Sequence, residues 1–143
     1  MNNVTAYSSE DVIRFVHEFA KGNDITDSTM LSEDLQLWGD DLDEFLAEYA
    51  KRFSVDMTNY LWYFHNREEG WNLGAAFVIP PNERVHHIPI SIGMLRDFAN
   101  TGRWMVDYPE HQLPKWRIDT ALTLAALVAA LLAVVVYVCN KGA

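Results

Sequence analysis

The chain has a single cysteine, Cys139, and few basic residues: eleven lysines and arginines against twenty aspartates and glutamates, a formal net charge of −9 at pH 7. One thiol excludes an internal disulfide framework and any zinc or iron–sulfur site built from several cysteines. The negative charge argues against binding to nucleic acid, because phosphates would be repelled. The first twelve residues, MNNVTAYSSEDV, lack the apolar core of a signal peptide.

The motifs of the commonest enzyme chemistries are also missing. The sequence has no G-x-S-x-G turn, no glycine-rich phosphate loop and no cysteine–histidine pair in its first 117 residues. His86 and His87 would point to opposite faces of a strand, so the two cannot easily bind one metal. One of them could join His65 or His111 in a zinc site, but no carboxylate or cysteine spacing supports it. The acidic run Asp40–Glu44 does not follow the calcium-loop pattern. We therefore predict a non-enzymatic protein without a metal or cofactor.

One stretch is strongly apolar. The eighteen residues from Ala121 to Val138 carry no charged side chain. As a helix this stretch would be about 27 Å long, close to the ~30 Å of a bilayer's hydrocarbon core. Trp116 and Tyr137 sit at its two ends, where aromatic rings prefer the lipid headgroup region. A helix of this length in the core of a soluble protein would normally show a polar stripe, so the stretch predicts a transmembrane helix. A fully buried or oligomeric core helix is the alternative.

Basic residues on the two flanks of this stretch are uneven. Lys115 and Arg117 precede it and Lys141 alone follows, while Asp119 dilutes the bias little. The bias favours a single-pass protein whose N-terminal part stays in the cytoplasm and contacts the lipid bilayer through its anchor. The predicted organisation is a cytoplasmic domain over residues 1–108, a linker over 109–117, a transmembrane helix over 118–139 and a short tail over 140–143.

Small side chains recur along the predicted span, at Ala121, Ala125, Ala129 and Ala133. A row of this kind lets two helices approach closely, which would support a homodimer. Alanine is also common in spans that do not associate, so the row leaves both states open.

The first 117 residues show helical periodicity in several places. Acidic residues open the second of these patterns, and Asp40 or Asp41 is expected to cap it. Between the helices, two apolar runs flank a Pro-Pro-Asn-Glu turn and predict a β-hairpin. The expected elements are helices from Ser8 or Ser9 to about Lys21, from Asp40 or Asp41 to Phe53, over Asn59–Phe64 and from Ser91 to Gly102, with strands at Ala75–Ile79 and Arg84–Ile88.

The run from Leu35 to Phe45, LQLWGDDLDEF, resembles the centre of acyl carrier proteins. In that family a glycine-containing turn leads into Asp-Ser-Leu at the start of the second helix, and here Asp40, Leu42 and Asp43 match its Asp, Leu and following acidic residue. The likeness covers residues 8–64 and 88–100. It implies a mainly α fold: an acyl-carrier-like four-helix bundle with a small inserted irregular or β-hairpin region, plus one C-terminal transmembrane helix.

The chain departs from the family at the attachment position. Where the family carries phosphopantetheine on a serine, this sequence has Asp41, which lacks a hydroxyl. The pattern is similar to a small group of bacterial carrier-like proteins of unknown function, which implies a place at the bacterial inner membrane. The alternative is a genuine acyl carrier modified at another serine, with Ser32 and Ser54 as the nearest candidates.

Carrier proteins meet basic partners through the acidic start of the second helix, and the resemblance implies the same use here. The predicted docking residues for an unidentified basic protein partner are Asp40, Asp41, Asp43, Glu44 and Glu48. Two other interpretations stay open. In the first, the carboxylates simply stabilise the start of the helix, because the helix dipole favours negative charge there. In the second, the protein acts through its transmembrane helix, and the domain is a passive cap.

Overall fold

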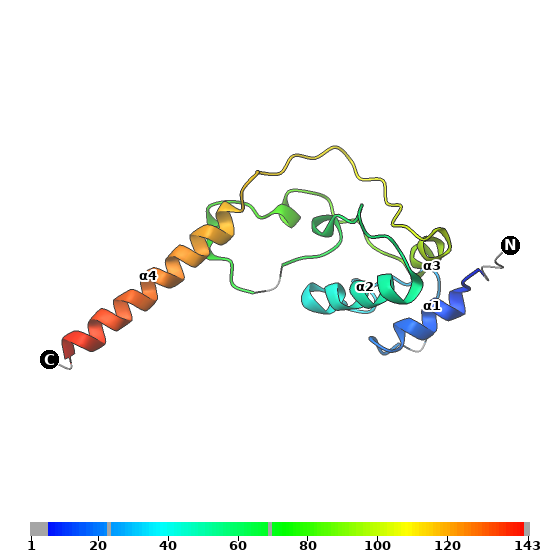
Figure 1. Cartoon of the computed structure of the whole chain (residues 1–143), viewed down its shortest axis with the longest axis horizontal. Helices are drawn as coiled ribbons and strands as arrows, with labels where there is room; N and C mark the ends of the chain where they lie inside the picture. Colours follow the sequence, from blue (N-terminus) through cyan, green and yellow to red (C-terminus); the bar gives the residue numbers. More distant parts are fainter. Residues whose placement is uncertain (1–5, 23, 69, 142–143) are drawn as a thin grey trace.

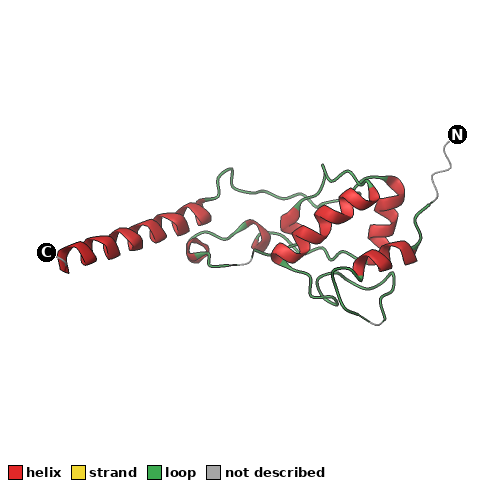
Figure 2. Cartoon of the chain, turned by 60° about the horizontal axis from the view of Figure 1, so that its bottom comes forward, coloured by secondary structure: helices red, strands yellow, loops and turns green. Residues whose placement is uncertain are grey.

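The computed structural model describes residues 6–22, 24–68 and 70–141. Within them the chain forms α-helices and 3₁₀ turns but no β-strand (Figure 1, Figure 2). The protein is therefore mainly helical, as predicted. The elements are α1 (Ser9–Val16), α2 (Gly39–Phe53), η1 (Trp62–Phe64), η2 (Leu73–Ala76), η3 (Pro81–Glu83), α3 (Ile92–Thr101) and α4 (Ile118–Lys141).

Helices α1, α2 and α3 pack together to form the head of the molecule, on the right of Figure 1. Aromatic rings fill the space between α1 and α2: the ring of Phe15 lies 5.2 Å from that of Phe45 and 5.5 Å from that of Phe53. The Tyr49 hydroxyl donates a hydrogen bond of 2.5 Å to the carbonyl of Leu95 in α3. Burying an aromatic side chain of this kind contributes about 2 kcal/mol, so these contacts account for much of the head's stability.

Local sequence signals set the helix ends where they were predicted at three places. Ser8 and Asp11 form a reciprocal capping box at the start of α1. The Ser91 hydroxyl accepts a hydrogen bond of 3.2 Å from the backbone N–H of Met94 at the start of α3. Gly102 ends α3 with φ +70°, a left-handed conformation that favours glycine.

Helix α1 is shorter than predicted. It ends at Val16 rather than near Lys21. The next amides bond three residues back, from Glu18 to Phe15 and from Phe19 to Val16, so the helix tightens and stops. This turn brings the Phe19 ring to 5.3 Å from that of Phe45, which shows that core packing overrides the helical periodicity.

The predicted hairpin is wrong, and the segments Ala75–Ile79 and Arg84–Ile88 do not pair. Backbone groups around η2 bond locally instead: the Asn72 side chain accepts the N–H of Ala75 at 3.1 Å. In the second segment, the Ile88 N–H donates to the Phe64 carbonyl at 2.7 Å instead of to a partner strand. The predicted helix at Asn59–Phe64 is likewise reduced to the single 3₁₀ turn η1.

Helix α4 leaves the head as an extended rod, at the left of Figure 1. It is 24 residues long, contains a stretch of 18 residues with a mean hydropathy of 2.8, and is long and apolar enough to cross a membrane. The predicted span began at the same residue, 118, and ended two residues earlier. The segment between Gly102 and α4 arches over the head without helical structure (yellow in Figure 1). Of the predicted tail over 140–143, residues 142 and 143 lie outside the described part.

Candidate docking groove beside the C-terminal helix

The acidic face predicted on α2 is solvent-exposed. Five carboxylates lie on the first three turns of the helix and all are exposed: Asp40, Asp41, Asp43, Glu44 and Glu48. Only one of them forms an ion pair within the described residues, Glu48 with Lys51 at 3.7 Å. Most of this negative charge is therefore available to a partner.

The prediction that Asp40 or Asp41 caps α2 is wrong. The helix begins at Gly39, its N-cap is Trp38, and no side chain caps it from that position. The cap comes from Asn66 instead. Its amide oxygen accepts the Gly39 N–H at 2.7 Å, and its amide nitrogen donates to the Gly39 carbonyl at 2.8 Å and to an Asp43 carboxylate oxygen at 2.9 Å.

Asn66 is only 5% exposed and ties the segment after η1 to the start of α2. Sequence reasoning missed it, because 27 residues separate Asn66 from Gly39 and a single asparagine has no periodic signal. Its position fixes the direction of the first turn of α2. The Asp43 carboxylate is therefore held by a largely buried side chain, and Asp40 follows the backbone that this side chain fixes at Gly39.

The neighbouring residue His65 anchors the same segment to the core. Its Nδ1 lies 2.7 Å from the Ile88 carbonyl, which can only accept, so Nδ1 carries the proton. Its Nε2 then accepts from the Tyr108 hydroxyl at 2.8 Å, while that hydroxyl accepts from the Trp104 indole N–H at 2.8 Å. Burial is the largest influence on His65 and lowers its pKa to about 4, so the ring is neutral at physiological pH.

A groove of about 790 Å³ opens between the start of α2, the segment 62–83 and the first turns of α4; we call it the α2–α4 groove. Two of the five predicted docking residues line it, Asp40 and Asp43. Asp41, Glu44 and Glu48 do not, so the structure divides the predicted set into a groove-facing pair and three residues elsewhere on the helix.

The walls of the α2–α4 groove differ in chemistry. Opposite the α2 carboxylates, α4 contributes two threonines and two leucines: Thr120, Thr123, Leu124 and Leu127. The segment 62–83 adds the carboxylates of Glu68 and Glu83. It also adds Arg67, whose guanidinium lies 4.4 Å from the ring centre of Trp38. The groove can therefore accept a ligand with positive charge on one side and apolar surface on the other.

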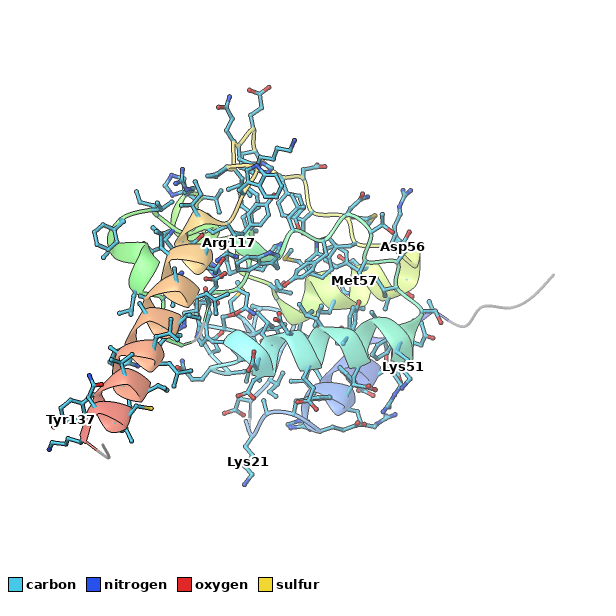
Figure 3. All side chains as sticks on the ribbon, turned by 60° about the vertical axis from the view of Figure 1, so that its left-hand side comes forward. Lys21, Lys51, Asp56, Met57, Arg117 and Tyr137 are labelled. Carbon is cyan, nitrogen blue, oxygen red and sulfur yellow. The ribbon has the colours of Figure 1, made fainter. Side chains whose placement is uncertain are left out.

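The first turn of α4 is fixed to the segment 62–83 by a polar cluster. Arg117 holds both carboxylate oxygens of Asp119, at 3.0 and 2.7 Å, and contacts Glu68 at 2.7 Å (Figure 3 labels Arg117 at this end of α4). These hydrogen bonds raise the pKa of Arg117 above its ordinary value, so the guanidinium keeps its charge. Asn72 donates to Asp119 at 2.9 Å and accepts from the Thr123 hydroxyl at 2.9 Å.

Asp119 is only 2% exposed. From the sequence, it was expected only to offset slightly the positive charge of Lys115 and Arg117 before the span. A carboxylate directly before an apolar run is a signal that it needs partners, and Arg117 could have been named as one. Asn72 could not, because it lies 47 residues away along the chain. The cluster fixes the position of α4 relative to the groove.

The remaining predictions concern metal ligands, the two candidate serines and the alanine row of α4. Among residues 6–22, 24–68 and 70–141, no group of three or more His, Cys, Asp or Glu is arranged to hold a metal. Ser32 is 2% exposed, whereas Ser54 is exposed at the end of α2. The row of small residues on α4 is exposed at Ala121, Ala125, Ala129 and Ala133.

A family model described as a protein of unknown function (DUF1493) matches residues 2–107. This range covers α1, α2, α3 and the segment 62–83, and it ends before α4. No curated protein and no solved structure matches the chain.

Proposed function

The chain belongs to the family described as a protein of unknown function (DUF1493), and from this premise we propose that it is a non-enzymatic, membrane-anchored interaction module that binds a basic segment of a partner protein. In this proposal α4 crosses the bacterial inner membrane once. The head lies on the cytoplasmic side, because Lys115 and Arg117 precede α4 and a single lysine, Lys141, ends it.

The observation that carries the proposal is the shared groove. Asp40 and Asp43 line the same cavity as Leu124 and Leu127, which belong to the apolar run of α4. A membrane around α4 therefore begins beside these carboxylates. Membrane proteins carry excess lysine and arginine next to the cytoplasmic ends of their helices. The α2–α4 groove is complementary to such a juxtamembrane segment in charge, and it lies at the same level relative to the membrane surface.

The energetics favour a segment with several basic residues. An exposed ion pair contributes less than about 1 kcal/mol, because water screens it. Four carboxylates line the groove, at Asp40, Asp43, Glu68 and Glu83. Glu68 already pairs with Arg117. The other three are balanced by one lining guanidinium, that of Arg67, so two or more new pairs can form together. The apolar α4 wall adds contact area for the partner's own helix. Charge of one sign also raises the encounter rate and selects complementary partners.

The resemblance to acyl carrier proteins supports the same use, since that family docks through the start of its second helix. The alternative of a carrier modified at another serine has less support. Ser32 is buried, and Ser54 follows the C-terminal end of α2 rather than opening the helix. An acyl arm would add mass to the chain during co-expression with a phosphopantetheinyl transferase, so intact mass separates the two proposals.

A third possibility is that α4 acts by itself, with the alanine row forming a homodimer. Replacing α4 from Val128 onward with an unrelated apolar helix leaves intact the junction at Asp119 and Thr123 and the groove wall at Leu124 and Leu127. If the head carries the function, activity and partner capture survive this exchange. Their loss would favour the span instead.

The test of the docking proposal is a pair of matched charge reversals in the full chain. Asp40→Lys with Glu83→Lys changes the groove, whereas Asp41→Lys with Glu44→Lys makes the same change in net charge outside it. We expect the groove variant to bind the partner captured from native membranes about tenfold less tightly, which is ~1.4 kcal/mol. The control variant should bind like the unmodified chain. An equal loss of affinity in both variants would contradict the groove proposal, because the partner would then respond to negative charge anywhere on α2.

A further inference from the structure

An uncharged segment of thirteen residues, from Gly70 to Asn82, contains η2 and lies beside the first turns of α4. Four of its large apolar side chains point into solvent: Trp71 is 88% exposed, Phe77 83%, Ile79 54% and Leu73 45%. A tryptophan and a phenylalanine this exposed leave a large apolar area in contact with water, at a cost of about 25 cal/mol for each Å².

The position of this segment along the axis of α4 is fixed by hydrogen bonds and by backbone contact. The Gly74 N–H donates to the Thr123 hydroxyl at 2.9 Å, and Asn72 bonds both Thr123 and Asp119. A Cβ at position 74 would lie 1.9 Å from the Asp119 carbonyl oxygen, so the two backbones are in direct contact. Figure 3 shows η2 (green) beside the Arg117 end of α4, with Tyr137 at the far end.

The segment lies at the level along α4 where the apolar run of that helix begins. Thr123 is the third residue of the uncharged stretch Ala121–Val138. Any bilayer that covers Leu122 and Leu124 therefore also reaches η2. On the other side of the cluster, charged Glu68 and Arg117 mark the aqueous side. Trp116, 72% exposed, adds a second tryptophan at the same end of α4.

We propose that the segment Trp71–Ile79 is a membrane-seated loop, which inserts Trp71, Leu73, Phe77 and Ile79 into the lipid interface beside α4. The inference rests on the proposed membrane anchoring of α4. The occupant is lipid rather than another protein, because the loop continues the apolar surface of α4 at the same level and carries no charge. Tryptophan favours this headgroup region. The loop and α4 thus form two contacts with the bilayer and hold the α2–α4 groove at a constant level at the membrane surface.

The test is a depth measurement with spin labels on the full chain in phosphatidylcholine vesicles. Cys139→Ser removes the native thiol, and single labels are placed at Phe77→Cys or at Trp71→Cys. Both side chains are more than four-fifths exposed, so replacing them leaves the core intact. Lys51→Cys, with a side chain 78% exposed on α2, reports water, and Val134→Cys reports the span.

We expect the labels at 77 and 71 to lose accessibility to a water-soluble nickel reagent and to gain accessibility to oxygen, relative to residue 51. If residues 77 and 71 behave like 51 while 134 is lipid-buried, the loop inference is wrong and the anchor stands. If 134 is also water-accessible, the anchoring proposal itself is wrong. Low accessibility to both reagents, with dipolar broadening between labels, would mean that a second copy covers the loop and would also overturn it.

Discussion

The side-chain amide of Asn72 donates a hydrogen bond of 2.9 Å to the carboxylate of Asp119, across 47 residues of sequence. This contact joins the segment 62–83 to the first turn of α4 and closes one side of the α2–α4 groove. Asp119 is also bound by Arg117, so the carboxylate is fully engaged although it is buried. The relative position of the head and α4 follows from this cluster.

Gly74→Ala should detach η2 from α4. The new methyl group would overlap the Asp119 carbonyl oxygen, which is backbone and cannot rotate away. We expect amide hydrogens at residues 74 and 75 to exchange at least about tenfold faster, a loss of ~1.4 kcal/mol in local protection. Hydrogen exchange read by mass spectrometry on the full chain in micelles measures this.

The matched control for that change is Ala76→Ser, which alters an exposed residue of the same turn. It should leave the exchange rates unchanged. Unchanged rates in Gly74→Ala itself would show that η2 does not pack against α4 as described.

Asn66→Ala should destabilise the head through α2. The variant loses the cap on Gly39 and the bond to Asp43, and leaves the Gly39 N–H without a partner in a buried place. Loss of a helix cap costs about 1–2 kcal/mol, so the urea midpoint should fall. Asn59→Ala, at an exposed position, is the control and should unfold like the unmodified chain. Equal midpoints for the two variants would contradict the role of Asn66.

His65 should make the head sensitive to acid. Its pKa is lowered to about 4 in the folded chain, against 6.5 for an ordinary histidine. Between these values the unfolded chain binds more protons than the folded one, so the free energy of unfolding falls as the pH drops from 6.5 to 4. The contribution is fully present above pH 6.5, and its loss amounts to about 3 kcal/mol at the acid end.

Urea unfolding followed across this pH range measures the effect. His65→Gln should be less stable at neutral pH but should show a flatter dependence between pH 6.5 and 4. His86→Gln, an exposed histidine, should keep the slope of the unmodified chain. An identical slope in His65→Gln would mean that other groups cause the acid sensitivity.

The parts of the fold that sequence predicted are those set by local or periodic signals. The apolar faces of α2 and the uncharged run of α4 extend over many residues, and Ser8, Ser91 and Gly102 act on neighbouring backbone groups. The hairpin was wrong because two apolar runs around a turn resemble strands, yet backbone groups of these runs bond within the turn of η2 and to Phe64 instead of to each other. The apolar periodicity also predicted too long a helix α1, because the packing of Phe19 against the core determines where the helix ends.

The acidic residues of the candidate site were predicted, but its shape was not. The i,i+3 spacing puts Asp40 and Asp43 on one side of the helix and Asp41 and Glu44 on another, but it does not indicate which side faces α4. That orientation involves contacts of Asn66 and Asn72, single polar residues far from their partners in sequence. Contacts of this kind leave no periodic pattern, and only the three-dimensional structure reveals them.

Site-specific photocrosslinking in native membranes tests the docking proposal most directly. A photoreactive side chain replaces Glu83 in the α2–α4 groove or Glu48 outside it, and the crosslinked peptide is identified by mass spectrometry. We predict that the probe at 83 captures a lysine- or arginine-rich segment next to a transmembrane helix of a partner, and that the probe at 48 does not. Capture of the same segment from both positions, or of no basic segment from position 83, would contradict the proposal.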